Sequence, residues 1–146
     1  MGLVEQFIIH LQASGVEVRE TSDPREKFFR ATKSGNAIAV LAHESKEIGV
    51  WDIRESLLGE CEANWEKPEN KLRGWGASLL DKTAVTGFWI SGENYSELFD
   101  CGFVSQKKNG AILFDARRLR EHPDLAPYFR SIEQFLQLSG LDAKLE

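Results

Sequence analysis

The sequence predicts an α/β fold of the mixed α+β type, with a central mixed sheet that contains β-hairpins and is flanked by N- and C-terminal helices. Three observations support this prediction. Apolar residues recur every three or four positions at 3–14 and 124–138, as in amphipathic helices. Between them, two short glycine-containing loops each join a pair of apolar runs, which is the pattern of a hairpin. The chain has 146 residues, the length of one domain, so we assign 1–146 to a single domain.

The N-terminal part of the chain predicts a helix, a strand and a hairpin, in that order. The helix at 3–14 is followed by Gly15, which is a natural C-terminal stop. At 16–19, valines then alternate with charged residues, the period of a half-buried strand. Apolar-rich runs at 27–32 and 37–43 flank a short loop that contains a glycine, and this arrangement predicts a β-hairpin.

The middle of the chain is less regular. Residues 48–53 fit either a strand or the lead into a helix, and 54–65 is predicted as a helix although its periodicity is weak. The glycine-rich run at 73–77 is interpreted as a turn before a helix. Residues 83–90 are the strongest buried-strand pattern in the second half of the chain.

The C-terminal part predicts a short helix at 94–100, a second hairpin and the closing helix. An Asn-Gly pair lies between the apolar residues 103–104 and 111–114, and Asn-Gly is the strongest short-range hairpin signal. Because strands joined by hairpins pair antiparallel, we expect a mixed sheet with helices packed against it.

Composition and charge exclude several classes of protein. Apolar residues make up 42% of the chain, and 9 Phe, 4 Trp and 2 Tyr supply a core, unlike in a disordered chain. The net charge of −5 opposes strong non-specific binding to nucleic acid but allows a locally basic surface. The sequence has no apolar run of membrane-spanning length and no secretory signal pattern, so we expect a cytoplasmic protein without a membrane partner. Cys61 and Cys101 fit neither zinc spacing nor a disulfide framework.

Acidic residues near the ends of the first hairpin predict a metal site. Asp23 precedes its first strand, and Glu44 and Lys46 lie at the end of its second. Because the start of one antiparallel strand lies beside the end of its neighbour, Asp23 and Glu26 are within reach of Glu44. Two carboxylates can hold Mg²⁺ and leave coordination sites for water and a phosphate. We therefore predict Asp23, Glu44 and Lys46 as catalytic residues, with Asp23 and Glu44 as the metal ligands and Lys46 stabilising charge.

This arrangement resembles the PD-(D/E)XK, or restriction-endonuclease-like, nuclease superfamily over residues 3–46. That family runs helix, strand, then a hairpin with an acid first and a (Glu/Asp)-x-Lys pair later, and the step at 15–19 is similar to archaeal Holliday-junction resolvases. The resemblance implies a magnesium-dependent endonuclease that hydrolyses phosphodiester bonds in DNA, or a degenerate member of that fold. It also implies a further acid from the helix, here Glu5. The sequence differs from the family pattern in the order Asp23-Pro24 and in Ser45, where the family has an aliphatic residue.

The uneven charge distribution supports two different partners. Residues 105–120 are basic, which favours DNA binding through phosphate contacts; the residues predicted to make them are Lys107, Lys108, Arg117 and Arg118. Residues 52–69 carry six acids against two bases. Together with Trp51, Trp65 and Trp75, this acidic segment favours the alternative function of a non-catalytic acidic protein-interaction module, such as an inhibitor, an immunity-type or a regulatory protein. The sequence leaves the oligomeric state open.

Overall fold

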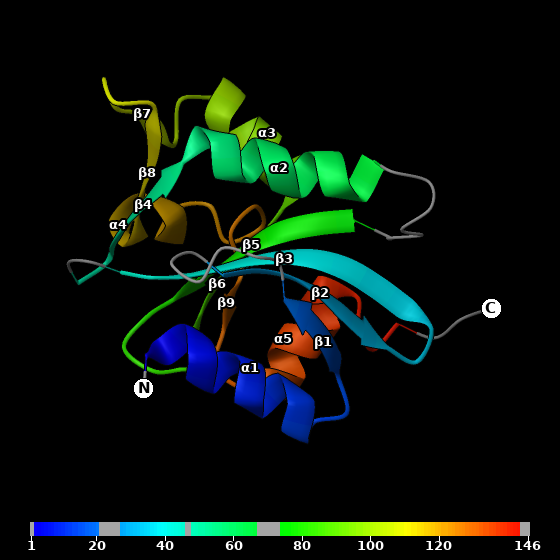
Figure 1. Ribbon diagram of the computed structural model, residues 1–146. Coiled ribbons are helices and arrows are strands. Elements are labelled where there is room, and N and C mark those ends of the chain that lie inside the picture. Colours follow the sequence, from blue (N-terminus) through cyan, green and yellow to red (C-terminus); the bar gives the residue numbers. More distant parts are fainter. Residues whose placement is uncertain (1, 21–26, 46–47, 67–73, 144–146) are drawn as a thin grey trace.

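The larger of two sheets runs through the centre of the molecule, with helices on both of its faces (Figure 1). The computed structural model describes residues 2–20, 27–45, 48–66 and 74–143. Within these, six strands lie in the order β1-β2-β3-β5-β6-β9; β3 and β5 are parallel, and the other neighbouring pairs are antiparallel. The strands are β1 (Glu17–Glu20), β2 (Lys27–Lys33), β3 (Asn36–Glu44), β5 (Gly74–Leu80), β6 (Gly87–Ser91) and β9 (Tyr128–Phe129).

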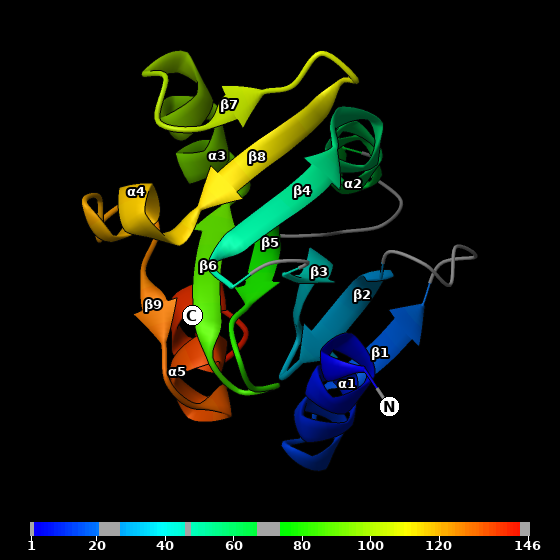
Figure 2. The same cartoon turned by 90° about the vertical axis from the view of Figure 1, so that its left-hand side faces the viewer.

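A smaller antiparallel sheet and two of the helices cover one face of the central sheet. Its strands lie in the order β4-β8-β7, and Figure 2 shows them on the same side as α2 and α3. They are β4 (Val50–Arg54), β7 (Ser105–Gln106) and β8 (Ala111–Asp115). The helices are α1 (Leu3–Ala13), α2 (Glu55–Glu66), α3 (Gly92–Asp100), α4 (Ala116–Arg120) and α5 (Ile132–Ser139).

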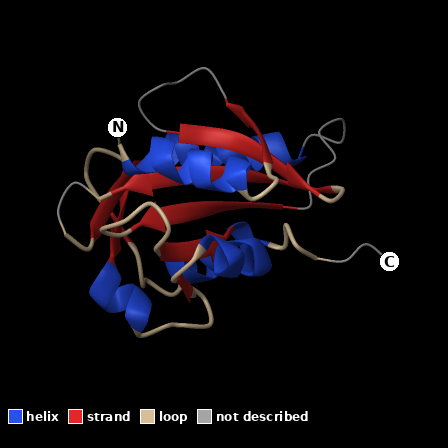
Figure 3. Cartoon of the chain, turned by 90° about the horizontal axis from the view of Figure 1, so that it is seen from below, coloured by secondary structure: helices blue, strands red, loops and turns tan. Residues whose placement is uncertain are grey.

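The central sheet has an apolar core on each face because successive residues of a strand point to opposite sides. In β3, Val40 packs on the side of α1 and α5, whereas Leu41 packs on the side of α2, β4 and β8. Figure 3 views the molecule from the α1 and α5 side. On that side Phe7 and Phe129 are fully buried, as the amphipathic patterns of their segments predicted. The predicted mixed sheet between N- and C-terminal helices is therefore confirmed.

Local turn signals placed the first hairpin correctly. In its register Lys33 pairs with Asn36, so the loop consists of Ser34 and Gly35. Both loop residues have positive φ, 52° and 83°, as a two-residue hairpin loop of type I′ requires. The predicted helices at 3–14, 54–65 and 94–100 and the strand at 16–19 also agree with the structure to within about two residues at each end. Residues 48–53, which fitted either a strand or the lead into a helix, belong mainly to strand β4.

Three predicted segments differ from the structure. The run at 73–77 is not a turn before a helix, because Gly74–Leu80 form the central strand β5. A Cβ built on Gly76 would lie 2.5 Å from Trp89 Cη2, so this glycine permits close packing between strands and does not mark a turn. The strand expected at 83–90 begins only at Gly87. The helix expected at 124–138 begins only at Ile132, because Tyr128–Phe129 pair with β6 and Ser131 then caps the helix.

Candidate functional site

Glu44, the central residue of the predicted metal site, is the last residue of β3, and its side chain is exposed. Its neighbours on the same face, Val40 and Ala42, pack in the core beside α1, so Glu44 also lies on the α1 face of the sheet. There Glu44 Oε2 accepts a hydrogen bond of 3.2 Å from the backbone N–H of Leu3. The structure thus places the carboxylate at the N-terminus of α1.

The N-terminus of α1 uses this carboxylate as its cap. The residue that precedes the helix, Gly2, has no side chain that could accept a hydrogen bond from the first turn. The helix dipole also favours a negative charge at this end. A Cβ built on Gly2 would lie 3.5 Å from Glu44 Oε1, so the carboxylate lies against the start of the helix. Glu44 therefore stabilises the contact between α1 and the end of β3.

The other predicted metal-site residues are only partly described. Asp23, Glu26 and Lys46 lie outside the described residues. Glu5, the further acid that the resemblance implies, is exposed in the first turn of α1, so it lies at the same end of the helix as Glu44. Within the described part of the chain, no three His, Cys, Asp or Glu side chains converge to hold a metal ion. The predicted metal site of Glu44 and Asp23 therefore stays a prediction, because Asp23 lies outside the described residues.

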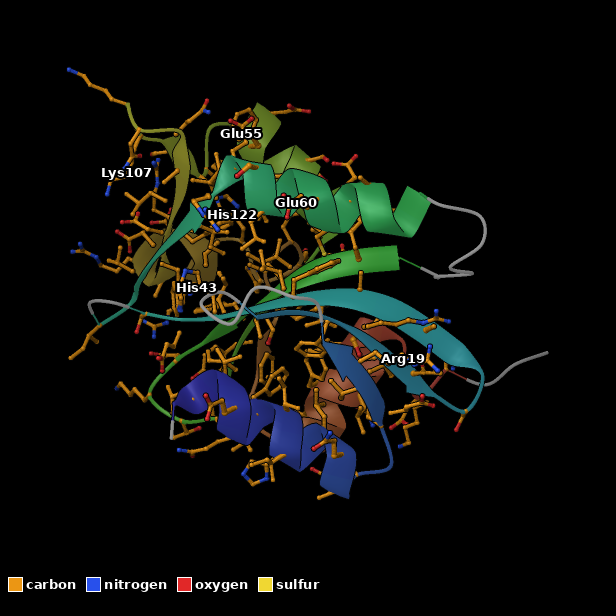
Figure 4. All side chains as sticks on the ribbon, in the orientation of Figure 1. Arg19, His43, Glu55, Glu60, Lys107 and His122 are labelled. Atoms are coloured by element: carbon orange, nitrogen blue, oxygen red, sulfur yellow. The ribbon has the colours of Figure 1, made fainter. Side chains whose placement is uncertain are left out.

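The four basic residues predicted to contact DNA form two groups at opposite ends of β8. Lys107 and Lys108 lie in the turn before this strand, and Figure 4 labels Lys107. Arg117 and Arg118 follow the strand, in α4. Five extended residues span about 16 Å, so the two groups do not form one continuous patch. Lys107 Nζ also forms an ion pair of 2.9 Å with Asp52 Oδ2. Arg117 Nε likewise forms an ion pair of 3.7 Å with Asp115 Oδ1. Lys108, Arg117 and Arg118 are all exposed.

A cavity of about 280 Å³, which the sequence did not predict, is lined by Arg117 together with Arg120, Asp81 and Lys82. The last two residues directly follow β5, whose final residue pairs in register with Glu44. The cavity therefore lies at the same end of the parallel β3–β5 pair as Glu44. Lys82 has a φ of 63°, a left-handed conformation that is costly for a residue with a side chain and that occurs often at functional sites. No sequence signal pointed to this cavity, because β5 itself was not predicted.

Two of the tryptophans that favoured an interaction module are core residues. Trp51 is fully buried, and its indole N–H donates a 3.0 Å hydrogen bond to the Leu80 carbonyl. Trp75 is 5% exposed, and the side chain of Trp65 is not among those described. Trp51 and Trp75 are therefore not the exposed anchors that a protein interface would need.

Burial raises the pKa of the Cys61 thiol, which keeps the thiol protonated and makes it a poor nucleophile.

No family model matches the sequence, and a search of curated proteins finds no match. Among the described residues, no helix has the length and apolar character needed to cross a membrane.

Proposed function

We propose that the protein is a cytoplasmic magnesium-dependent nuclease that hydrolyses phosphodiester bonds in DNA, or a degenerate member of that fold. One observation carries the proposal: Glu44 at the end of the second hairpin strand and Glu5 in the first helix lie at the same end of α1. The order of α1, β1 and the β2–β3 hairpin also agrees with the helix, strand and hairpin of the superfamily that the sequence resembles.

The chemistry of the donor set fits a hard divalent cation. Carboxylate oxygens are the ligands that Mg²⁺ prefers, and it retains several waters beside one or two of them. With Glu44 Oε2 bonded to the Leu3 amide, we assign Glu44 Oε1 and the carboxylate of Asp23 as the metal ligands. Mg²⁺ held by these carboxylates would lower the pKa of the attacking water and offset charge at the scissile phosphate. Lys46 adds a positive charge that stabilises the transition state.

The basic residues of α4 support a DNA substrate. Arg117 lines the cavity that lies at the same end of β3 and β5 as Glu44, so phosphates bound there would follow the edge of the sheet toward the carboxylates. Arg118 is exposed on the same short helix. Lys107 and Lys108 lie at the far end of β8 and are less suited to the same stretch of backbone.

The proposal is tested with Glu44→Gln, because glutamine keeps an acceptor for the Leu3 amide but removes the negative charge. We expect Mg²⁺ binding by calorimetry, and Mg²⁺-dependent cleavage of linear and branched DNA, to be lost in this variant and in Asp23→Ala. The free energy of unfolding should fall by about 0.3–1 kcal/mol in Glu44→Gln, because the variant keeps the acceptor for the Leu3 amide but loses the negative charge at the N-terminus of α1. Glu60→Gln, an exposed change of the same kind on α2, should leave binding and cleavage unchanged.

Three outcomes distinguish the alternatives. Wild-type protein that binds Mg²⁺ and DNA without cleaving it would be the degenerate member of the fold. Cleavage that persists in Glu44→Gln would refute the assigned site. If the wild type binds neither Mg²⁺ nor Mn²⁺ and cleaves no DNA, the nuclease proposal is wrong, and the non-catalytic interaction module remains.

A further inference from the structure

A cavity of about 340 Å³ lies at the end of the central sheet opposite Glu44. It is lined by Ile38 and Gly74, which pair with each other near the starts of β3 and β5. Residues of α2, β6, α3 and the end of α5 complete the lining. This volume is many times the roughly 30 Å³ that one water molecule occupies in the liquid, and it is at the lower end of the range for small-molecule sites. The cavity therefore has room for a compact organic molecule.

Two buried tryptophans line the cavity from opposite faces of the central sheet, Trp75 from the side of α2 and Trp89 from the side of α1 and α5. Trp75 packs across Gly92, where a Cβ would overlap the indole nitrogen, and Trp89 packs across Gly76. Ring contacts hold both indoles in place: the centroids are 5.9 Å apart for Trp75 and Tyr95, and 5.3 Å apart for Trp89 and Phe135 of α5. Side chains packed in this way are ordered before any ligand binds, so binding incurs little cost from ordering them.

The electrostatic field of the cavity favours a cation. Among the described residues, the charged ones in its lining are Glu62 from α2 and Glu93 from α3, both exposed acids, and neither forms an ion pair with another described residue. The C-terminal end of α5, at Leu138–Gly140, also faces the cavity and carries the negative end of a helix dipole. The other cavity, at Asp81, differs because its lining contains both acidic and basic residues.

The rest of the wall favours an organic cation over a metal ion. Ile38, Trp75, Trp89 and Leu138 supply apolar surface, which offers no ligand to Mg²⁺ or Ca²⁺. An indole attracts an ammonium or guanidinium group through its ring electrons and packs well against an apolar body. Carboxylates form charge-assisted hydrogen bonds with such groups.

We propose that this cavity binds a small organic cation, in which an ammonium, amidinium or guanidinium group faces Glu62 and Glu93 and an apolar body packs against Trp75 and Trp89. The site is separate from the nuclease site, because it lies at the other end of β3 and β5 and uses none of the same residues. Binding can be measured without DNA or Mg²⁺, so its success or failure is independent of the proposed nuclease function.

The test uses benzamidine and agmatine as cationic probes and benzamide as the neutral analogue of benzamidine. Affinity is measured by calorimetry, and the indole N–H resonances of the tryptophans are followed by NMR. We expect benzamidine to bind at least about tenfold more tightly than benzamide, since the charge is the main difference between them. The probe should shift the resonances of Trp75 and Trp89 more than that of Trp51, which is buried elsewhere in the core.

Matched double variants separate the acids of the cavity from the general charge of the protein. The variant with Glu62→Gln and Glu93→Gln should bind benzamidine at least about tenfold more weakly. The control, with Glu60→Gln and Glu97→Gln, changes exposed acids on the same two helices outside the cavity lining and should bind as the wild type does.

A filled-cavity variant tests the location of the site. A Cβ built on Gly74 meets nothing within 4 Å, so Gly74→Val should fold and should block binding of both cationic probes. Equal affinity for benzamide and benzamidine, unchanged affinity in the Glu62 and Glu93 double variant, or no binding of either cationic probe would each overturn the proposal. Tight binding of Ca²⁺ that competes with benzamidine would show a metal site instead.

Discussion

Replacement of Phe7 by alanine is expected to remove a large part of the stability of the protein. Phe7 is fully buried, and its ring centroid lies 6.4 Å from that of Phe29, 6.3 Å from that of Phe129 and 5.0 Å from that of Phe135. Truncation of a buried phenylalanine typically costs about 3–5 kcal/mol, and an edge-on pair such as the one with Phe135 contributes about 0.5–1.5 kcal/mol beyond burial. Because whole domains are stable by only about 5–15 kcal/mol, this single change is severe.

Urea unfolding followed by circular dichroism measures the effect, with a lower midpoint and an unchanged slope as the expected result for Phe7→Ala. Phe7→Leu keeps most of the volume and should cost less than about 1.5 kcal/mol. Ile9→Ala on the same helix removes a side chain that is 49% exposed and should change stability by no more than about 0.5 kcal/mol. If Phe7→Ala costs no more than Ile9→Ala, then α1 does not pack on the sheet through Phe7 and the reasoning is refuted.

Two further predictions concern backbone packing and pH. Gly87→Ala would place a Cβ against the Leu79 carbonyl of the neighbouring strand and should lower the free energy of unfolding, measured in urea, by about 1–3 kcal/mol. In Gly59→Ala on α2 the new Cβ meets nothing within 4 Å, so this variant should be more stable than the wild type by about 0.5–1 kcal/mol. Equal effects of the two variants would contradict this reasoning. Burial, with help from nearby glutamates, raises the pKa of Tyr95 from 10.0 to about 12, above its value in the unfolded chain. The stability that Tyr95 contributes is therefore complete below about pH 10 and is lost as pH rises through about 12, so Tyr95→Phe should reduce the alkaline loss of stability measured by urea unfolding at a series of pH values.

Local sequence determined where Glu44 lies but not what it contacts. The Ser34-Gly35 turn sets the register of the β2–β3 hairpin, and this register places Glu44 at the end of β3. The hydrogen bond from Leu3 depends on how α1 docks on the sheet, which no spacing within the hairpin encodes. The position of the basic residues also needed the structure. Lys107 and Arg117 lie at opposite ends of β8, and the sequence did not show that this strand separates them.

The sequence by itself determined the elements whose signals are local. Amphipathic spacing indicated α1 and the second half of the closing helix. Turn residues indicated the β2–β3 hairpin and the turn of the β7–β8 hairpin, although β7 is Ser105–Gln106 and not the predicted 103–104. These features depend on neighbours within a few residues along the chain. Tertiary structure decided the elements at the centre of the sheet. Strand β5 is buried along nearly its whole length and shows no alternation, so its glycines suggested a turn.

The packing partners of β5 explain the roles of those glycines. Gly76 permits the approach of Trp89 from β6. Gly74, two residues earlier, lines the 340 Å³ cavity near the starts of β3 and β5. Tyr128–Phe129 likewise became strand β9 because β6 offered a free edge beside them. A strand buried on both faces gains its stability from partners that are distant in the sequence, so no local pattern marks its position.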